Sequence, residues 1–342
     1  MSTYISVTSG VPQGSVLGPL LFLLFINDLT DSTLPNVHVK LFADDLKLYT
    51  ELSYSSAHTN FQSQLNLIHL WATTWQLEIS YEKCNILNLH DKLPQTFSFN
   101  TTQIRTADSV NDLGVLIAPS LKFNNHIDSI ILKAKQRASI IHRSFLSKDK
   151  TILTRAFTTY VRPLLEYASP VWSPCHLTLI SAIESVQRNF TKRLSGLQNL
   201  NYSERLKLLT LKSLEHRRLI IDLQTCHKII HQNILITSEN FLKLSTTQNL
   251  RGHSFKLTLP LAKNTIQRHF FTTRIVKAWN SLPDKLVTIT NPNTFKRALN
   301  KHDLSKFLVG PTFLWYVYSF HNSYCIIFIT AASLITATQH TI

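Results

Sequence analysis

The chain has 342 residues, which is enough for two or three domains with a sizeable core. Its formal net charge of +15 and isoelectric point near 9.7 indicate a polyanionic partner, most simply nucleic acid. The four cysteines are scattered and form no CxxC pair, which argues against a disulfide scaffold and against a zinc knuckle. Residues 1–4 lack the basic and apolar segments of a signal peptide. We therefore expect a reducing compartment, the nucleus or the cytoplasm.

The charge is unevenly distributed along the chain. Residues 1–120 carry 5 Lys and Arg against 10 Asp and Glu, residues 121–310 carry 30 against 10, and residues 311–342 carry none of either. The segment charges of −5, +20 and 0 sum to the total of +15. The sequence therefore predicts an acidic module, then a strongly basic one, then an uncharged tail.

A glycine-rich stretch opens the acidic module. Residues 9–22 (SGVPQGSVLGPLLF) hold three of the chain's seven glycines together with two prolines, which predicts a loop whose backbone can approach another molecule closely. The apolar run Leu20–Ile26 follows, and it is long enough to form a buried helix. Asn27 and Asp28 close that helix.

Two alternating runs, Val37–Phe42 and Leu46–Thr50, flank Ala43, Asp44 and Asp45. Apolar and polar residues alternate in both runs, which predicts a β-hairpin with two adjacent carboxylates in its turn. Such carboxylates repel each other unless a cation is near, and a hard ion such as Mg²⁺ would supply that charge. The alternative is an ordinary solvated Asp-Asp turn.

The string GVPQGSVLGPLLF, followed about twenty residues later by FADD, resembles motifs B and C of reverse transcriptases, closest to those of non-LTR (LINE-type) retrotransposons of the jockey-like kind. The resemblance implies an RNA-directed DNA polymerase that uses Mg²⁺ or Mn²⁺, an RNA template with a DNA primer, and deoxynucleotide triphosphates. It implies that Asp44 and Asp45 are catalytic metal ligands. The residues that would shape the pocket for the incoming nucleotide and the templating base are Gly10, Pro12, Gln13, Gly14 and Ser15.

An amphipathic helix is predicted over Ala57–Leu77, because apolar residues recur there at spacings of three and four. Its expected core residues are Phe61, Leu65, Ile68, Ala72 and Trp75. The loop and strand of Leu77–Leu89 contain Lys83 and resemble motif D, whose lysine can face the leaving pyrophosphate. The competing interpretation is a plain surface lysine.

Asp112–Ile117 is a short predicted strand that resembles motif E, the primer-facing edge between palm and thumb. A long helix is predicted over Phe123–Phe145, with a core face of Ile127, Ile130, Ile131, Ala134, Ala138 and Ile141. Its basic residues, Lys133, Lys135, Arg137 and Arg143, suit a thumb that grips a nucleic-acid backbone. The alternative is a solvated helix face.

Residues 151–235 are expected to be almost wholly helical, in segments Thr151–Tyr167, Ile180–Leu194 and Tyr202–His231. Helical spacing in the first segment places Leu153, Ala156, Tyr160 and Leu164 on one face. The basic cluster Glu215–Arg218 lies in the last segment. Cys226, His227 and His231 come nearest to a metal cluster, but they lack a fourth ligand. We expect Phe271 and Trp279 to be core residues and not base-stacking platforms.

Residues 311–342 are uncharged and apolar, and they are long enough to span a bilayer if the interruption at residues 321–323 is tolerated. A membrane anchor is one interpretation. A docked C-terminal element and translated sequence beyond the end of a degraded element are two others.

Together these features predict an α+β fold. It comprises a partial polymerase palm (1–120, with the motif B helix, the motif C hairpin and motifs D and E), a helical thumb-like region (121–200), a basic helical region (201–310) and the apolar tail (311–342). The family's motif A aspartate has no counterpart in the chain, and Asp28 gives no reason to replace it. We therefore expect an exposed sheet edge and no polymerase activity from this chain. The alternatives are a non-catalytic nucleic-acid-binding remnant and a tail-anchored membrane protein.

Overall fold

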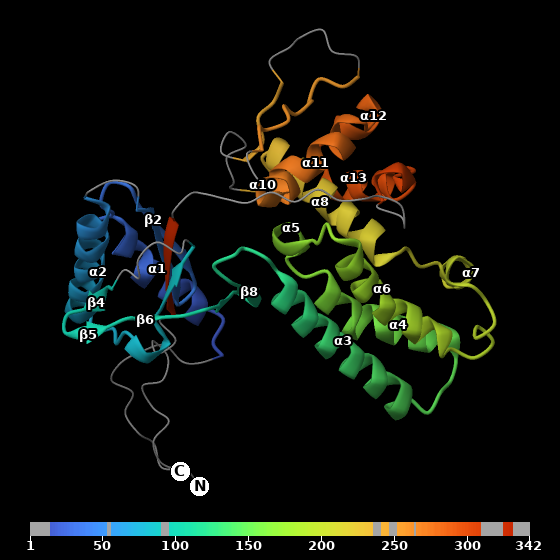
Figure 1. Cartoon of the computed structure of the whole chain (residues 1–342), viewed down its shortest axis with the longest axis horizontal. Helices are drawn as coiled ribbons and strands as arrows, with labels where there is room; N and C mark the ends of the chain where they lie inside the picture. Colours follow the sequence, from blue (N-terminus) through green and yellow to red (C-terminus); the bar gives the residue numbers. More distant parts are fainter. Residues whose placement is uncertain are drawn as a thin grey trace. The chain divides into compact units, whose positions relative to one another are not determined.

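The computed structural model describes residues 14–52, 56–89, 96–234, 241–245, 252–262, 265–308 and 324–330. They form an α+β structure of two compact units (Figure 1). Unit 1 comprises Met1–Lys122 with His321–Ile342, and unit 2 comprises Phe123–Phe320. The division falls close to the change from acidic to basic composition near residue 120.

Unit 1 holds the named strands of the described chain together with several short and long helical segments. The helical segments are α1 (Gly18–Ile26), the 3₁₀ turn η1 (Asn27–Thr30), α2 (Ala57–Thr74) and the 3₁₀ turn η2 (Tyr81–Lys83). The strands are β1 (Val37–Phe42), β2 (Asp45–Glu51), β3 (Asn85–Asn88), β4 (Ser98–Phe99), β5 (Thr102–Gln103), β6 (Arg105–Thr106), β7 (Val110–Asp112), β8 (Val115–Ile117) and β9 (Tyr324–Thr330).

The main sheet has the order β1-β2-β9-β3-β6, and the last strand in the sequence occupies its centre (Figure 1). β1 and β2 form the predicted hairpin, in a register that pairs Val37 with Thr50 and Phe42 with Asp45. β9 runs antiparallel to both β2 and β3. β2 and β3 are therefore both paired with a strand far from them in the sequence, and β1 and β6 are the edge strands of this sheet.

Helix α2 packs its apolar face on the sheet, as its spacing predicted. Phe61, Leu65, Ile68 and Ala72 are buried in a cluster with Leu46, Leu48 and Ile86 of the strands. The prediction was wrong for Trp75, which is 45% exposed, because the helix ends at Thr74 and Gln76 adopts a left-handed backbone (φ 56°). Gln64 is buried within the helix, and its Oε1 accepts a hydrogen bond from the Leu34 N–H at 2.7 Å.

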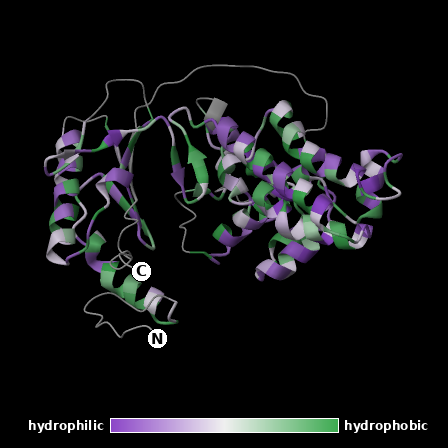
Figure 2. Ribbon diagram, turned by 90° about the horizontal axis from the view of Figure 1, so that it is seen from below, coloured by the Kyte–Doolittle hydropathy of each residue, from purple (hydrophilic) through white to green (hydrophobic). Residues whose placement is uncertain are grey.

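Helix α1 forms where the apolar run predicted it, but the prediction of a buried helix was wrong. Only Gly18 and Ile26 are buried, whereas Leu20, Leu23 and Leu24 are 52–67% exposed. The helix is apolar all round, and Figure 2 shows the helix nearest the N label as hydrophobic along its length. A helix that is apolar on every face can bury only one of them against a single layer.

The stretch predicted as one strand at Asp112–Ile117 is a hairpin of β7 and β8, with Val110 opposite Ile117. Its turn residues Leu113 and Gly114 both have positive φ (46° and 85°), as a tight two-residue hairpin turn requires. The chain therefore reverses at Gly114, inside the predicted strand.

Unit 2 is helical apart from an isolated bridge between Leu244 and Leu257 in its described residues. Its elements are α3 (Asn124–Ser144), α4 (Lys150–Tyr160), η3 (Arg162–Leu165), α5 (Ser169–Trp172), α6 (Leu177–Lys192), α7 (Tyr202–Leu208), α8 (Leu214–Ile230), α10 (Thr265–His269), α11 (Phe271–Asn280), α12 (Asp284–Val287), α13 (Pro292–Leu299) and η4 (Ser305–Phe307).

The predicted face of α3 is confirmed, because all six expected core residues are buried. Two predicted helices are interrupted. Thr151–Tyr167 ends as a helix at Tyr160, which is 58% exposed, before Pro163. Tyr202–His231 divides into α7 and α8, because Thr210 takes a left-handed conformation (φ 53°) and Ser213 caps α8 through its side chain.

Phe271 and Trp279 belong to the core of unit 2, as predicted, with 6% and 0% exposure. Residues 311–323 and 331–342 of the tail lie outside the described residues. Among the helices that the structure does describe, none combines the length and the apolar character needed to cross a bilayer.

Candidate functional site

The acidic turn joins β1 to β2 at one end of the main sheet. Phe42 pairs with Asp45, which leaves Ala43 and Asp44 as the turn, and Ala43 has a φ of 51°. Asp44 and Asp45 are both partly buried. The turn therefore holds the Asp44 carboxylate alone, and the prediction that both carboxylates lie in the turn was wrong for Asp45, which is the first residue of β2.

A third carboxylate, Asp112 at the end of β7, adds to the negative charge at this turn. Burial raises the pKa of the Asp45 carboxyl, and the charges of Asp44 and Asp112 raise it further. Lys47 Nζ forms an ion pair with Asp112 Oδ2 and offsets part of this charge. Nothing in the sequence pattern indicated this contact, because it joins residues 65 positions apart through folding of the β7–β8 hairpin.

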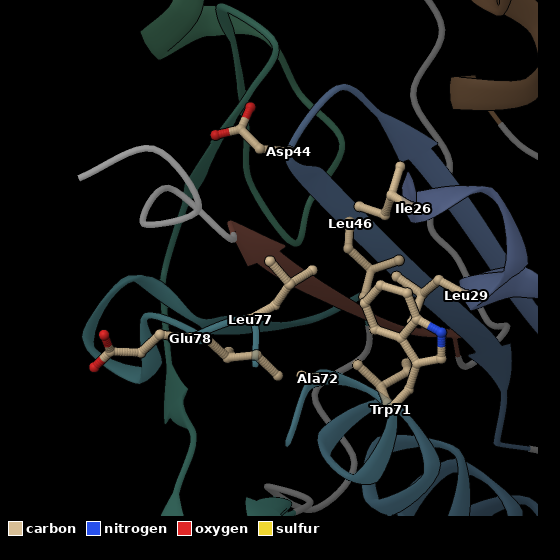
Figure 3. Close-up of a pocket in the computed structure, with 10 residues that line it drawn as sticks. Ile26, Leu29, Asp44, Leu46, Trp71, Ala72, Leu77 and Glu78 are labelled. Atoms are coloured by element: carbon tan, nitrogen blue, oxygen red, sulfur yellow. The ribbon is translucent and has the colours of Figure 1, made fainter. Parts of the chain in front are cut away.

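The space beneath the turn is part of the core. A cavity of about 30 Å³ lies between the turn and helix α2, room for about one water molecule. Figure 3 shows apolar side chains around it, including Ile26, Leu46 and Trp71, with the Asp44 carboxylate directed away from them. The Asp44 carboxylate therefore lies on the outer side of the turn (Figure 3).

Asp28, which was not expected to replace the missing aspartate, has a structural partner. Its Oδ1 accepts a hydrogen bond from Trp71 Nε1 of α2 at 3.1 Å. This bond ties η1 to α2. Across the described segments no three His, Cys, Asp or Glu side chains are arranged to hold a metal ion.

Lys83 lies at the same end of the sheet as the acidic turn. β2 and β3 both run antiparallel to β9, so they point in the same direction. Asp45 is the first residue of β2, and Lys83 comes two residues before the first residue of β3. The Lys83 side chain is exposed. The fold thus places Lys83 at the same end of the sheet as the Asp44–Asp45 pair.

Only part of the glycine-rich stretch can be located. Gly10, Pro12 and Gln13 lie outside the described residues. Gly14 has a φ of 82°, a backbone conformation that favours glycine. Ser15 Oγ accepts a hydrogen bond from the Gly18 N–H at 3.0 Å, so this side chain stabilises the start of α1.

The basic residues of unit 2 fall into two classes. On α3, Lys133, Lys135, Arg137 and Arg143 are exposed, and on α6 the exposed residues are Arg188 and Lys192. The cluster Glu215–Arg218 is different: Arg217 makes a two-point ion pair with Glu166, and His216 and Arg218 are buried. That cluster stabilises the fold, whereas α3 and α6 are among the helices that present exposed basic residues.

His227 and His231 share a helix face, as their spacing predicted, with ring centroids 4.4 Å apart. Their Nε2 atoms lie 2.5 Å from the Ile289 carbonyl and 2.8 Å from the Val287 carbonyl, where each donates a hydrogen bond. Burial lowers the pKa of His227. Cys226 is fully buried. The two histidines hold the C-terminal end of α8 to the end of α12 and the residues just after it, and with Cys226 they do not form a metal site among the described residues.

Comparison with known proteins agrees with this geometry. Residues 2–117 match the family model described as reverse transcriptase (RNA-dependent DNA polymerase). The chain is 26% identical over 223 residues to the probable RNA-directed DNA polymerase from transposon X-element of Drosophila melanogaster, covering 61% of this chain and 25% of that protein. It is 26% identical over 204 residues to the RNA-directed DNA polymerase from mobile element jockey of the same species, covering 56% and 22%.

The chain thus spans about a quarter of the length of these relatives. No solved structure matches it. The acidic turn of β1 and β2 and the start of α1 both fall inside the matched residues. Residues 2–117 are therefore similar to the reverse transcriptase family, and the chain is similar to the RNA-directed DNA polymerases of transposon X-element and mobile element jockey.

Proposed function

We propose that this chain is a segment of a retrotransposon RNA-directed DNA polymerase that binds a template–primer duplex but does not extend it by itself. Residues 1–120 are the partial palm, residues 121–200 the thumb-like region and residues 201–310 a basic helical region that extends the nucleic-acid contact. The observation that carries the proposal is the Asp44–Asp45 turn, presented at the same sheet end as Lys83.

The carboxylates at the turn suit one divalent ion and not two. Mg²⁺ in nucleotide sites is commonly held by one or two carboxylates together with substrate phosphates, and Asp44 and Asp45 would supply such a pair. Burial first, and then the charges of Asp44 and Asp112, raise the pKa of Asp45, and a bound cation would offset the second of these causes. When bound, the ion would neutralise the phosphates of the incoming nucleotide. Lys83 would face the leaving pyrophosphate.

A polymerase that uses two ions needs carboxylates from two backbone segments, because one turn cannot surround both ions. In the described part of the chain, the second segment near Asp45 supplies only Asp112, and Asp112 is paired with Lys47. This shortage of ligands supports the proposal that the chain lacks polymerase activity.

The exposed basic residues of α3 and α6 support the duplex-binding part of the proposal. These two helices pack on each other, and both present lysine and arginine side chains to solvent. Contacts to phosphates release counterions, so binding should weaken steeply with salt. The alternative, a non-catalytic nucleic-acid-binding remnant, would show the same salt-dependent duplex binding, but its acidic turn would have no function.

The first test is primer extension on poly(rA)·oligo(dT) with Mg²⁺ or Mn²⁺, comparing the chain with an Asp44→Ala variant. We expect no incorporation by either protein. Incorporation that disappears in the variant would contradict the proposed inactivity, and would mean that a further carboxylate completes the site.

The second test measures duplex binding as a function of salt. Replacing Lys133 and Lys135 by Glu on α3 should weaken binding at least tenfold and lower the salt slope by about two, one for each phosphate that a lysine no longer neutralises. Lys40→Glu combined with Arg105→Glu, two exposed changes in unit 1, is the control that changes the net charge by the same amount. Equal losses in both variants would show that only net charge matters and that α3 is not the contact surface.

A further inference from the structure

The centre of the main sheet is a slot that a distant part of the chain fills. β2 and β3 are the strands on either side of this slot, and they are connected through α2. β9 pairs with all seven residues of β2, from Asp45 opposite Thr330 to Glu51 opposite Tyr324. It also pairs with all four residues of β3, from Asn85 opposite Phe328 to Asn88 opposite Cys325. The edges of β2 and β3 that face the slot are therefore both paired with the same seven-residue strand, β9.

The composition of β9 suits an interior strand. Its sequence YCIIFIT has no charged residue and consists mainly of β-branched and aromatic residues, which favour strands. Strands at exposed edges usually carry charges or proline that discourage pairing, and β9 has neither. A segment of this kind would pair with other chains if it were left unpaired, so the fold gives it partners on both sides.

The end of the slot lies beside the acidic turn. Thr330 is opposite Asp45, so the strand that enters the slot decides which residue lies next to the two carboxylates. In this chain that residue is a threonine, which has no carboxylate. The neighbouring backbone segment therefore adds no carboxylate at this register.

We propose that residues 324–330 are a built-in strand that fills the slot between β2 and β3, and that its Thr330 end closes the position from which a second segment could bring a carboxylate to Asp44 and Asp45. The slot itself is a binding surface for one extended apolar strand, and its occupant is this chain's own C-terminal segment. The second part of the inference rests on the proposed function of the acidic turn.

The register allows a direct test, because β9 contains a natural cysteine. Cys325 is opposite Asn88, and residues directly opposite each other on neighbouring strands have Cβ atoms close enough for a disulfide after small shifts. In the full chain, Asn88→Cys should form an intramolecular disulfide with Cys325 on mild oxidation, detected by mass spectrometry of the digested protein. Leu89→Cys is the matched control, because adjacent residues of a strand point to opposite faces.

We expect at least tenfold more of the disulfide in Asn88→Cys than in Leu89→Cys. Equal yields, no disulfide, or a disulfide that joins two chains would overturn the proposal, the last because the strand would then come from a second copy. Hydrogen exchange of the unmodified chain gives a second readout that needs no variant to fold. Slow exchange over residues 324–330 supports the built-in strand, and exchange as fast as in an unfolded peptide contradicts it.

A separate measurement distinguishes this proposal from the proposed function. Thr330→Asp places a carboxylate opposite Asp45, and it should tighten Mn²⁺ binding at least tenfold, measured by the loss of the free-ion signal in electron paramagnetic resonance. Thr330→Asn is the control of equal size without charge. If the disulfide forms but Thr330→Asp binds no more Mn²⁺ than the control, then the strand is in place and the acidic turn is not a metal site.

Discussion

Replacing Arg274 by Ala should destabilise unit 2 by about 3–5 kcal/mol, the usual cost of removing one partner of a buried ion pair. Its guanidinium joins α11 to Asp222 of α8 through two bonds, Nε to Oδ2 at 2.9 Å and Nη2 to Oδ1 at 3.0 Å. Nη2 also donates to the Pro170 carbonyl at 2.9 Å, which ties in α5. The Asp222 side chain is only 5% exposed, so the substitution would leave a buried carboxylate without its hydrogen-bonded cation, with the charge of Arg218 still nearby.

The loss can be measured in unit 2 alone through Cys226. This thiol is fully buried in α8, one turn from Asp222, and burial raises its pKa well above the usual value, so it should react only when the helix unfolds. Pulsed thiol labelling across a urea series, read by mass spectrometry of the Cys226 peptide, gives the free energy of unfolding. A loss below about 1 kcal/mol for Arg274→Ala would refute the reasoning, because such a value is typical of exposed pairs.

One double variant and the pH dependence check whether the buried ion pair causes the loss of stability. Combining Arg274→Met with Asp222→Leu should restore most of the stability, since apolar replacements of a buried pair are often neutral. Burial raises the pKa of Asp222, and Arg274 holds it down. Without Arg274 the folded-state pKa rises further above the unfolded value of 3.8. Stability is then present below pH 3.8 and is lost as the pH rises, so the deficit of Arg274→Ala should be smaller at pH 4 than at pH 7.

Three further predictions concern other parts of the chain. Burial lowers the folded-state pKa of His227 below its usual value of 6.5, so its contribution to stability is complete above pH 6.5 and is lost as the pH falls. His227→Gln should therefore reduce the change in the free energy of unfolding between pH 7 and pH 5, measured by urea titration. Leu20→Lys with Leu24→Lys should reduce light scattering at high protein concentration and change the free energy of unfolding by less than about 0.5 kcal/mol per site, because both side chains are exposed. Gln64→Ala should cost about 1–3 kcal/mol in thermal unfolding, since the buried Leu34 N–H loses its acceptor, and no measurable loss would show that water replaces it.

Local pattern was sufficient for the elements whose residues interact mainly with near neighbours in the sequence. The alternation around Asp44 predicted the hairpin, and its register is the one expected for a two-residue turn. The three- and four-residue spacing predicted the core faces of α2 and α3. These predictions succeed because a strand or helix with one apolar face has only one way to bury it.

Sequence pattern gave wrong predictions where burial or a helix boundary depends on what packs against the element. Helix α1 was expected to be buried because every residue of its apolar run looked like core, yet most of its leucines are exposed. The helix predicted over Tyr202–His231 breaks near Thr210, whose left-handed backbone no periodicity indicates. The Glu215–Arg218 cluster counted toward the basic helical region in the sequence, but Arg217 is paired and Arg218 is buried within unit 2.

The sequence by itself determined the chemistry that the molecule can present: an acidic turn, a basic helical region and an uncharged apolar tail, each recognisable from residues close together in the chain. Only the tertiary structure decided which of these meet. Asp112 reaches Asp45 from 67 residues away, and the strand of residues 324–330 enters the sheet beside β2 from the far end of the chain. Pairing across such distances depends on which strand edges remain open after the local elements form, and no local pattern records that.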